Sequence, residues 1–141
     1  MGIAKPTNFA YPAYDLSPAT VKILQHERYE FARIGKNRAY DPLTDHPLLI
    51  PSWAMKASNK EQIMTAFKEA HDGQIVVLTI HGVPDIEHPW VTTPPELFEE
   101  YLKYLSDNHY KVISFRDLKQ YIDVKEALKK IDPDFSRALK K

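Results

Sequence analysis

The sequence predicts an α/β fold with about four or five parallel strands and flanking helices. Helical patterns and short apolar runs alternate along the chain, and the helices carry clear start signals. The order is strand, helix, strand, long loop, strand, helix, strand, loop, helix, strand, helix. This alternation indicates parallel strands joined by right-handed crossover connections. The length of 141 residues favours a single domain.

The predicted strands are short apolar stretches. They cover residues 8–11, 29–34, 48–50, 74–80 and 111–115. The clearest is 74–80, which shows no polar alternation over its apolar centre. A strand without alternation is typical of parallel sheets, so we expect both of its faces to be covered.

The predicted helices begin at recognisable capping sequences. Ser17 is an N-cap residue placed before Pro18, whose missing N–H costs nothing at the first helical position. Residues 58–61 and 93–96 read as capping boxes, in which a hydroxyl and a carboxylate each satisfy a free backbone N–H. Shorter helices are expected near Phe115 and Asp123. Residues 1–124 then form the α/β unit, and 125–141 a charged peripheral helix or tail.

Composition excludes several classes of protein. Lys and Arg number 19 and Asp and Glu number 19, so the net charge is zero, which argues against charge-driven binding to nucleic acid or to anionic membranes. The longest apolar run is far too short to span a bilayer. The absence of cysteine excludes disulfides, thiolate zinc sites and a cysteine nucleophile. No signal peptide is visible, and the compartment stays open.

Chemically useful side chains follow the predicted strands. Active sites in parallel α/β folds form at the carboxyl ends of the strands. Those ends carry Tyr11 and Tyr14, then Arg33, then Trp53, then His81. Aromatic and ionisable groups are therefore expected to converge on one rim.

Each of these residues has a functional and a structural interpretation. His81 can exchange a proton near neutral pH, or it can be a hydrogen-bonded histidine at a strand end. Arg33 can orient a carboxylate or bind an anionic substrate. Tyr11, Tyr14 and Trp53 are either walls of the site or core residues.

The loop after His81 allows further interpretations. Trp90 forms a lid or a sugar-stacking surface, or it plugs the loop onto the core. His81 and His88 could be taken for a metal pair, but seven residues across a proline-containing loop is no recognised ligand spacing.

Several segments together resemble the polysaccharide deacetylase (NodB-homology) family. They are residues 8–15 followed by a helix, 29–33, 76–84, and the tail from 95–98 through 112–118. Their order and spacing match the family over residues 2–122. The resemblance implies a distorted (β/α) barrel of fewer than eight units. It also implies metal-dependent hydrolysis of acetyl groups from amino sugars of a glycan.

The resemblance assigns roles to individual residues. His81 matches the family's strand-end histidine, the general acid toward the leaving amine. Ala10 stands where the family has the arginine of its Arg-Pro-Pro-Tyr run, and Arg33 on the next strand is the candidate to compensate. Trp53 is the nearest counterpart of a family Asp–Trp element, here without a clear aspartate.

The chain also departs from the family. It has neither the Thr-Phe-Asp-Asp segment nor the His-x-x-x-His segment that supply the base and the metal ligands, so it resembles the C-terminal half of the barrel. A divalent metal such as zinc is expected only if those motifs are supplied, and the isolated chain is expected to release no acetate. Family members often act on exported or cell-surface glycans.

Alternatives to an enzyme remain. The chain is otherwise a non-catalytic carbohydrate-binding remnant that uses Tyr11, Tyr14, Trp53 and Trp90, or a structural fragment without a ligand. Half a barrel leaves open strand edges. A homodimer of two half-barrels, or an open sheet partly covered by the tail, would address them.

Overall fold

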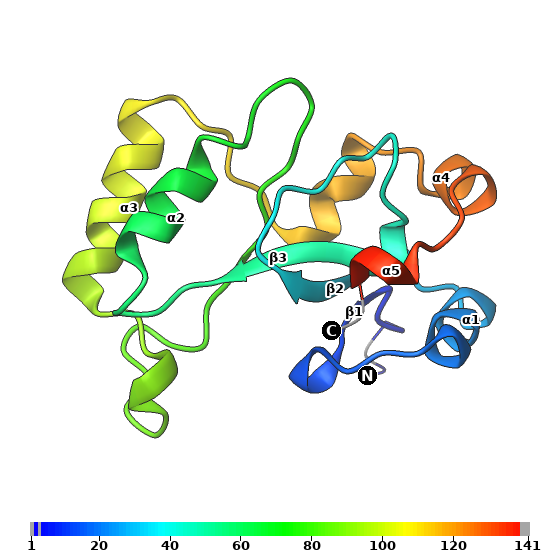
Figure 1. The fold of residues 1–141 in the computed structure, drawn as a ribbon, viewed down its shortest axis with the longest axis horizontal. Helices are drawn as coiled ribbons and strands as arrows, with labels where there is room; N and C mark the ends of the chain where they lie inside the picture. Colours follow the sequence, from blue (N-terminus) through cyan, green and yellow to red (C-terminus); the bar gives the residue numbers. More distant parts are fainter. Residues whose placement is uncertain (1, 3, 139–141) are drawn as a thin grey trace.

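Four parallel strands form a curled sheet that resembles half of a barrel (Figure 1). The computed structural model describes residue 2 and residues 4–138. The strands are β1 (Asn8–Ala10), β2 (Phe31–Lys36), β3 (Ile50–Ala54) and β4 (Leu78–Thr79), and they lie side by side in chain order. The predicted α/β class and the parallel sheet are thus confirmed at this coarse level.

Helices connect and flank the strands. Helix α1 (Pro18–His26) links β1 to β2, and α2 (Lys60–Phe67) links β3 to β4. After β4 come α3 (Pro95–Asp107), α4 (Val124–Lys130) and α5 (Phe135–Ala138). Short 3₁₀ segments are η1 (Pro12–Tyr14), η2 (Pro47–Leu49), η3 (Pro89–Val91) and η4 (Phe115–Gln120). Within the described residues, no helix has the length and apolar composition needed to cross a membrane.

The capping signals place the helix starts well, although two of them work differently from the prediction. Ser17 accepts a hydrogen bond from the Thr20 N–H at 3.2 Å, as expected of an N-cap. The N-cap of α2 is Asn59, whose side chain instead bonds the end of β3, donating to the Ala54 carbonyl at 2.8 Å. Thr93 donates to the Met55 carbonyl at 3.5 Å. In place of both predicted capping boxes, these side chains bond to the last carbonyl of β3 and to the carbonyl that follows it.

The core has an outer and an inner layer because strand side chains alternate between faces. On the outer face, Ala32 and Ile34 pack with residues of α1, and Trp53 packs with residues of α2 and α3. On the inner face, Phe31 and Ile50 pack against η4. The inner face of the half-barrel is therefore filled near its amino end by the segment that follows α3.

Three strand predictions are wrong in detail. Of residues 48–50, only Ile50 belongs to β3, because Pro47–Leu49 forms η2. Among the described residues, 111–115 have no strand partner: 110–114 have no regular structure, and Phe115 begins η4. Only Leu78 and Thr79 of 74–80 belong to β4, and the apolar centre is half-buried rather than covered on both faces. None of the described residues pairs with the far edge of β4, which ends the sheet.

The C-terminal segment packs against the sheet side that carries α1. Leu128 and Phe135 contact this part of the core, and Ala138 is buried in it. Residues 139–141 of the predicted tail lie outside the described residues. The part of the tail up to Ala138 therefore belongs to the folded core.

A buried ionic network holds the connection between β2 and β3. Asp45 accepts two hydrogen bonds from the Arg38 guanidinium, at 2.6 and 2.9 Å, and one from the Asp41 N–H at 2.9 Å. Arg137 of α5 lies 3.2 Å from the same carboxylate. This network attaches the C-terminal segment to the loop.

Candidate ligand-binding rim

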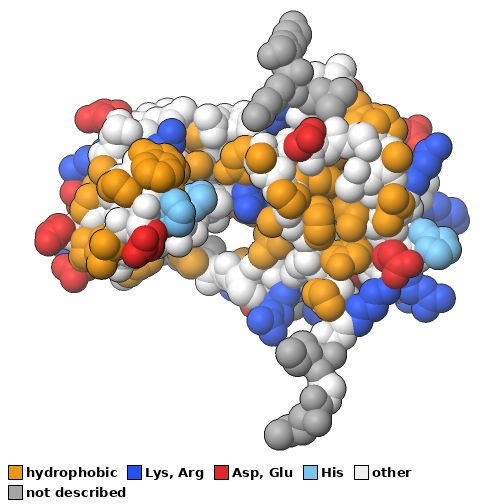
Figure 2. Space-filling model, turned by 90° about the horizontal axis from the view of Figure 1, so that it is seen from below, with side chains coloured by type: hydrophobic (Ala, Val, Ile, Leu, Met, Phe, Trp, Pro, Cys, Tyr) orange, Lys and Arg blue, Asp and Glu red, His pale blue; other side chains and the backbone are white. Residues whose placement is uncertain are grey.

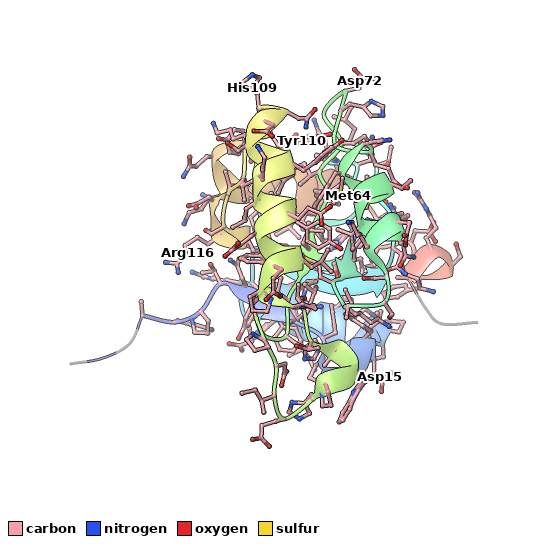
Figure 3. The ribbon with its side chains drawn as sticks, turned by 90° about the vertical axis from the view of Figure 1, so that its left-hand side faces the viewer. Asp15, Met64, Asp72, His109, Tyr110 and Arg116 are labelled. Carbon is pink, nitrogen blue, oxygen red and sulfur yellow. The ribbon has the colours of Figure 1, made fainter. Side chains whose placement is uncertain are left out.

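The carboxyl ends of the strands form one rim. Segment η1 follows β1, and the loop of residues 82–93 follows β4; both project from the same side of the sheet (Figure 1). Figure 2 views the molecule from that side and shows a hollow that divides this face of the surface into two parts. In Figure 3, Asp15 at this rim lies at the opposite end of the molecule from the polar turns at Asp72 and His109.

Tyr14 and Arg33 meet at this rim, as the sequence placed them. The Arg33 guanidinium carbon lies 5.4 Å from the centroid of the Tyr14 ring, a cation–π arrangement. Gly35 makes room for the ring, because a Cβ there would lie 3.3 Å from two Tyr14 ring carbons. Arg33 Nη1 is buried and has no hydrogen-bond partner among the described residues. Because a buried donor normally has a partner, this nitrogen retains bonding capacity for water or a ligand oxygen.

A hydroxyl pair that sequence reasoning missed ties three strands together. Ser52 on β3 donates to the Ile34 carbonyl at 2.6 Å, and Thr79 on β4 donates to Ser52 Oγ at 3.2 Å. Ser52 is fully buried and its proton is engaged by a carbonyl, so the pair is structural rather than nucleophilic. The signal in the sequence is a serine in an otherwise apolar strand.

His81 lies two residues beyond Thr79, directly before the 82–93 loop, and its side chain is exposed. No hydrogen bond or ion pair engages its ring within the part of the chain that the structure describes. An exposed imidazole at a strand end can give or take a proton from a bound molecule.

The 82–93 loop is held in shape by its own hydrogen bonds. The Asp85 N–H donates to Thr92 Oγ1 at 2.8 Å, and the Asp85 carboxylate accepts from the His88 N–H at 2.9 Å. The Thr93 N–H donates to the Gly82 carbonyl at 3.1 Å. The loop is therefore a preformed platform.

Gly82→Ala is expected to disturb this platform and to lower the free energy of unfolding by about 1–2 kcal/mol, a typical cost of overpacking. An added Cβ would lie 2.9 Å from Asp85 Cβ and 3.0 Å from its Cα, so the loop backbone has to move. Urea denaturation measures the change. Gly2→Ala is the control, since a Cβ there meets nothing within 4 Å. Equal stability of the two variants would contradict the prediction.

Trp90 stands out from this platform. Its side chain is 69% exposed, and its ring lies edge-on to His88 with centroids 5.4 Å apart. The indole therefore does not plug the loop onto the core. His88 Nδ1 lies 3.2 Å from Asp85, and the described residues contain no group of three His, Cys, Asp or Glu side chains that could hold a metal.

The other two predicted stacking residues lie in the core. Tyr11 is 2% exposed, its hydroxyl donates to the Leu48 carbonyl at 3.1 Å, and burial raises its pKa to about 12. Trp53 is 6% exposed among residues of α2 and α3. Neither ring presents an open face, so we assign both to packing. Tyr14 and Arg33 therefore meet where β1 and β2 end, whereas His81 and Trp90 follow β4, at the other end of the strand order.

Comparison of the chain with models of protein families, with curated proteins and with solved structures gives no match. The family resemblance therefore stays a prediction, and the functional proposal depends on the rim.

Proposed function

We propose that this rim binds an amino-sugar glycan, and that the chain is part of a polysaccharide-deacetylase-type hydrolase. The observation that carries the proposal is an exposed His81 beside a preformed loop that presents Trp90. Trp90 offers the apolar face on which sugar rings stack, and Tyr14 with Arg33 adds an aromatic and a cationic group. His81 would protonate the amine that leaves when the acetyl group is removed.

The metal of such a hydrolase does not fit the residues that the structure describes, because these hold no suitable cluster of ligands. We therefore derive no hydrolytic step here. Zinc or another divalent ion would require ligands from outside the described residues. For the isolated chain we propose glycan binding without acetate release, which makes a non-catalytic carbohydrate-binding protein the second candidate function.

Trp90→Ala is expected to weaken binding of chitooligosaccharide about tenfold, because loss of one stacking ring removes about 1–1.5 kcal/mol. Titration followed by tryptophan fluorescence and by calorimetry measures both proteins. Tyr121→Ala, another exposed aromatic residue, is the matched control and is expected to bind like the unaltered chain.

Two outcomes would contradict the proposal. One is the absence of any heat or fluorescence change when the unaltered chain is titrated with the sugar. The other is metal-dependent acetate release by the purified chain, which would contradict only the proposal that the isolated chain is not catalytic. His81→Ala is expected to bind the sugar like the unaltered chain, because the role proposed for His81 is proton transfer and not binding.

A further inference from the structure

A groove of about 680 Å³ runs along the free edge of the sheet. One wall consists of residues 73–78 with Ile80, which include β4. The other wall is residues 110–115, which begin at Tyr110 and end just before Arg116, both labelled in Figure 3. Residues of α3, among them Phe98 and Tyr101, complete the lining. The groove therefore separates β4 from the segment whose sequence predicts the next strand.

Both walls carry backbone groups without partners. The Val77 carbonyl accepts from the N–H of Trp53 on β3, and the Thr79 carbonyl from the N–H of Met55 just after it, each at 2.9 Å. Because strand residues alternate in direction, the N–H and C=O groups of Val76, Leu78 and Ile80 point the other way, into the groove. Across the groove, the N–H groups of residues 111–114 form no hydrogen bond within the described chain. Both segments that line the groove thus have backbone groups without a partner among the described residues.

The lining is mostly apolar and carries one charge. Val112 is 68% exposed, and Ile80, Leu102, Ile113 and Tyr121 are also exposed hydrophobic residues of this lining. Lys111 is the one charged residue that lines the groove, and its Nζ lies 4.8 Å from the Tyr121 ring centroid. No carboxylate of the described residues lies within 4.0 Å of that nitrogen. An exposed apolar patch of this kind marks an interaction site, and Lys111 favours an acidic group in the occupant.

We propose that this groove binds an extended segment of a partner polypeptide as an added strand. The segment carries apolar side chains at alternate positions and one carboxylate that faces Lys111. A polypeptide backbone satisfies the hydrogen-bonding groups of both walls, which is the general mode of strand addition at a sheet edge. An alkyl chain would bury the same groups without partners, at a cost. The lining itself contains no carboxylate, so two copies joined lining to lining would leave both Lys111 side chains without an acidic partner.

The test uses labelled six-residue peptides with Val at alternate positions, Thr between them, and one Glu placed in turn at each Thr position. Fluorescence anisotropy measures their binding to the full chain. We expect the best Glu peptide to bind about tenfold more tightly than the same peptide with Gln. Lys111→Gln is expected to remove this difference, and Lys119→Gln, an exposed lysine of η4 outside the lining, to preserve it.

An N-methylated version of the best peptide distinguishes strand pairing from simple apolar association. Methylation removes backbone N–H groups, so this peptide is expected not to bind. Equal binding of the N-methylated peptide would overturn the proposal. So would binding of dodecanoate without binding of any peptide, a dimer in sedimentation that excludes the peptides, or no anisotropy change at millimolar concentration.

Discussion

Asp45→Ala is expected to lower the free energy of unfolding by about 3–5 kcal/mol, the usual cost of breaking a buried ion pair from one side. The carboxylate is only 5% exposed and receives two hydrogen bonds from Arg38 and one from the Asp41 N–H. Its removal leaves the Arg38 guanidinium and a backbone N–H without their acceptor. Because Arg137 also pairs with Asp45, the attachment of α5 weakens in the same variant.

Two variants calibrate this expectation. Arg137→Ala is expected to cost about 0–1 kcal/mol, because the lost guanidinium is 48% exposed and Asp45 keeps its two hydrogen bonds to Arg38. Arg38→Lys keeps the charge but loses the paired geometry, so an intermediate cost is expected. Urea denaturation at pH 7 measures all three. A cost below about 1 kcal/mol for Asp45→Ala would contradict the role of the network.

Acidification from pH 7 to pH 4 is expected to lower the free energy of unfolding by about 3 kcal/mol through His46 alone. Burial lowers the pKa of this histidine from 6.5 to about 4, against a smaller upward pull from Asp132. The unfolded chain therefore takes up a proton at a higher pH than the folded chain. The stabilisation of the folded chain by neutral His46 is fully present above pH 6.5, and it is lost as the pH falls toward 4.

His46→Asn is the variant that isolates this effect. His46 Nδ1 accepts a hydrogen bond from the Leu48 N–H at 3.1 Å, and an Asn side-chain oxygen can accept the same bond without titrating. We expect the variant to be less stable at pH 7 but to show a flatter dependence between pH 6.5 and 4. An unchanged slope in the variant would assign the pH dependence to other groups. The other five histidines are exposed.

The sequence predicts which aromatic residues follow the strands, but not which of them are exposed at the rim. Tyr11 and Tyr14 are equally plausible rim residues in the sequence, and Trp53 and Trp90 are both candidates, with core packing the default for Trp53. The structure buries Tyr11 and Trp53 and leaves Trp90 open, with Tyr14 against Arg33. Which aromatic ring of a pair faces solvent depends on the elements packed around it, here α1, α2 and α3. That information lies far away along the chain.

What the sequence determines by itself is local. Ser17 with Pro18 and Asp123 start helices where they were predicted, because an N-cap bond joins residues three apart. Alternating apolar runs and helices are likewise enough to predict the parallel α/β class. The order of these elements also predicts which residues, among them His81, follow the strands and lie at the carboxyl-end rim.

Tertiary structure alone decides the edge of the sheet. Residues 111–115 have the composition of a strand, yet a strand exists only where a second backbone pairs with it, and none of the described residues does so. The hydroxyl of Thr93 likewise turns from its expected cap to Met55, because β3 lies within reach. Hydrogen bonds between neighbours in sequence can be read from the sequence, whereas those between distant segments follow from how the whole chain packs.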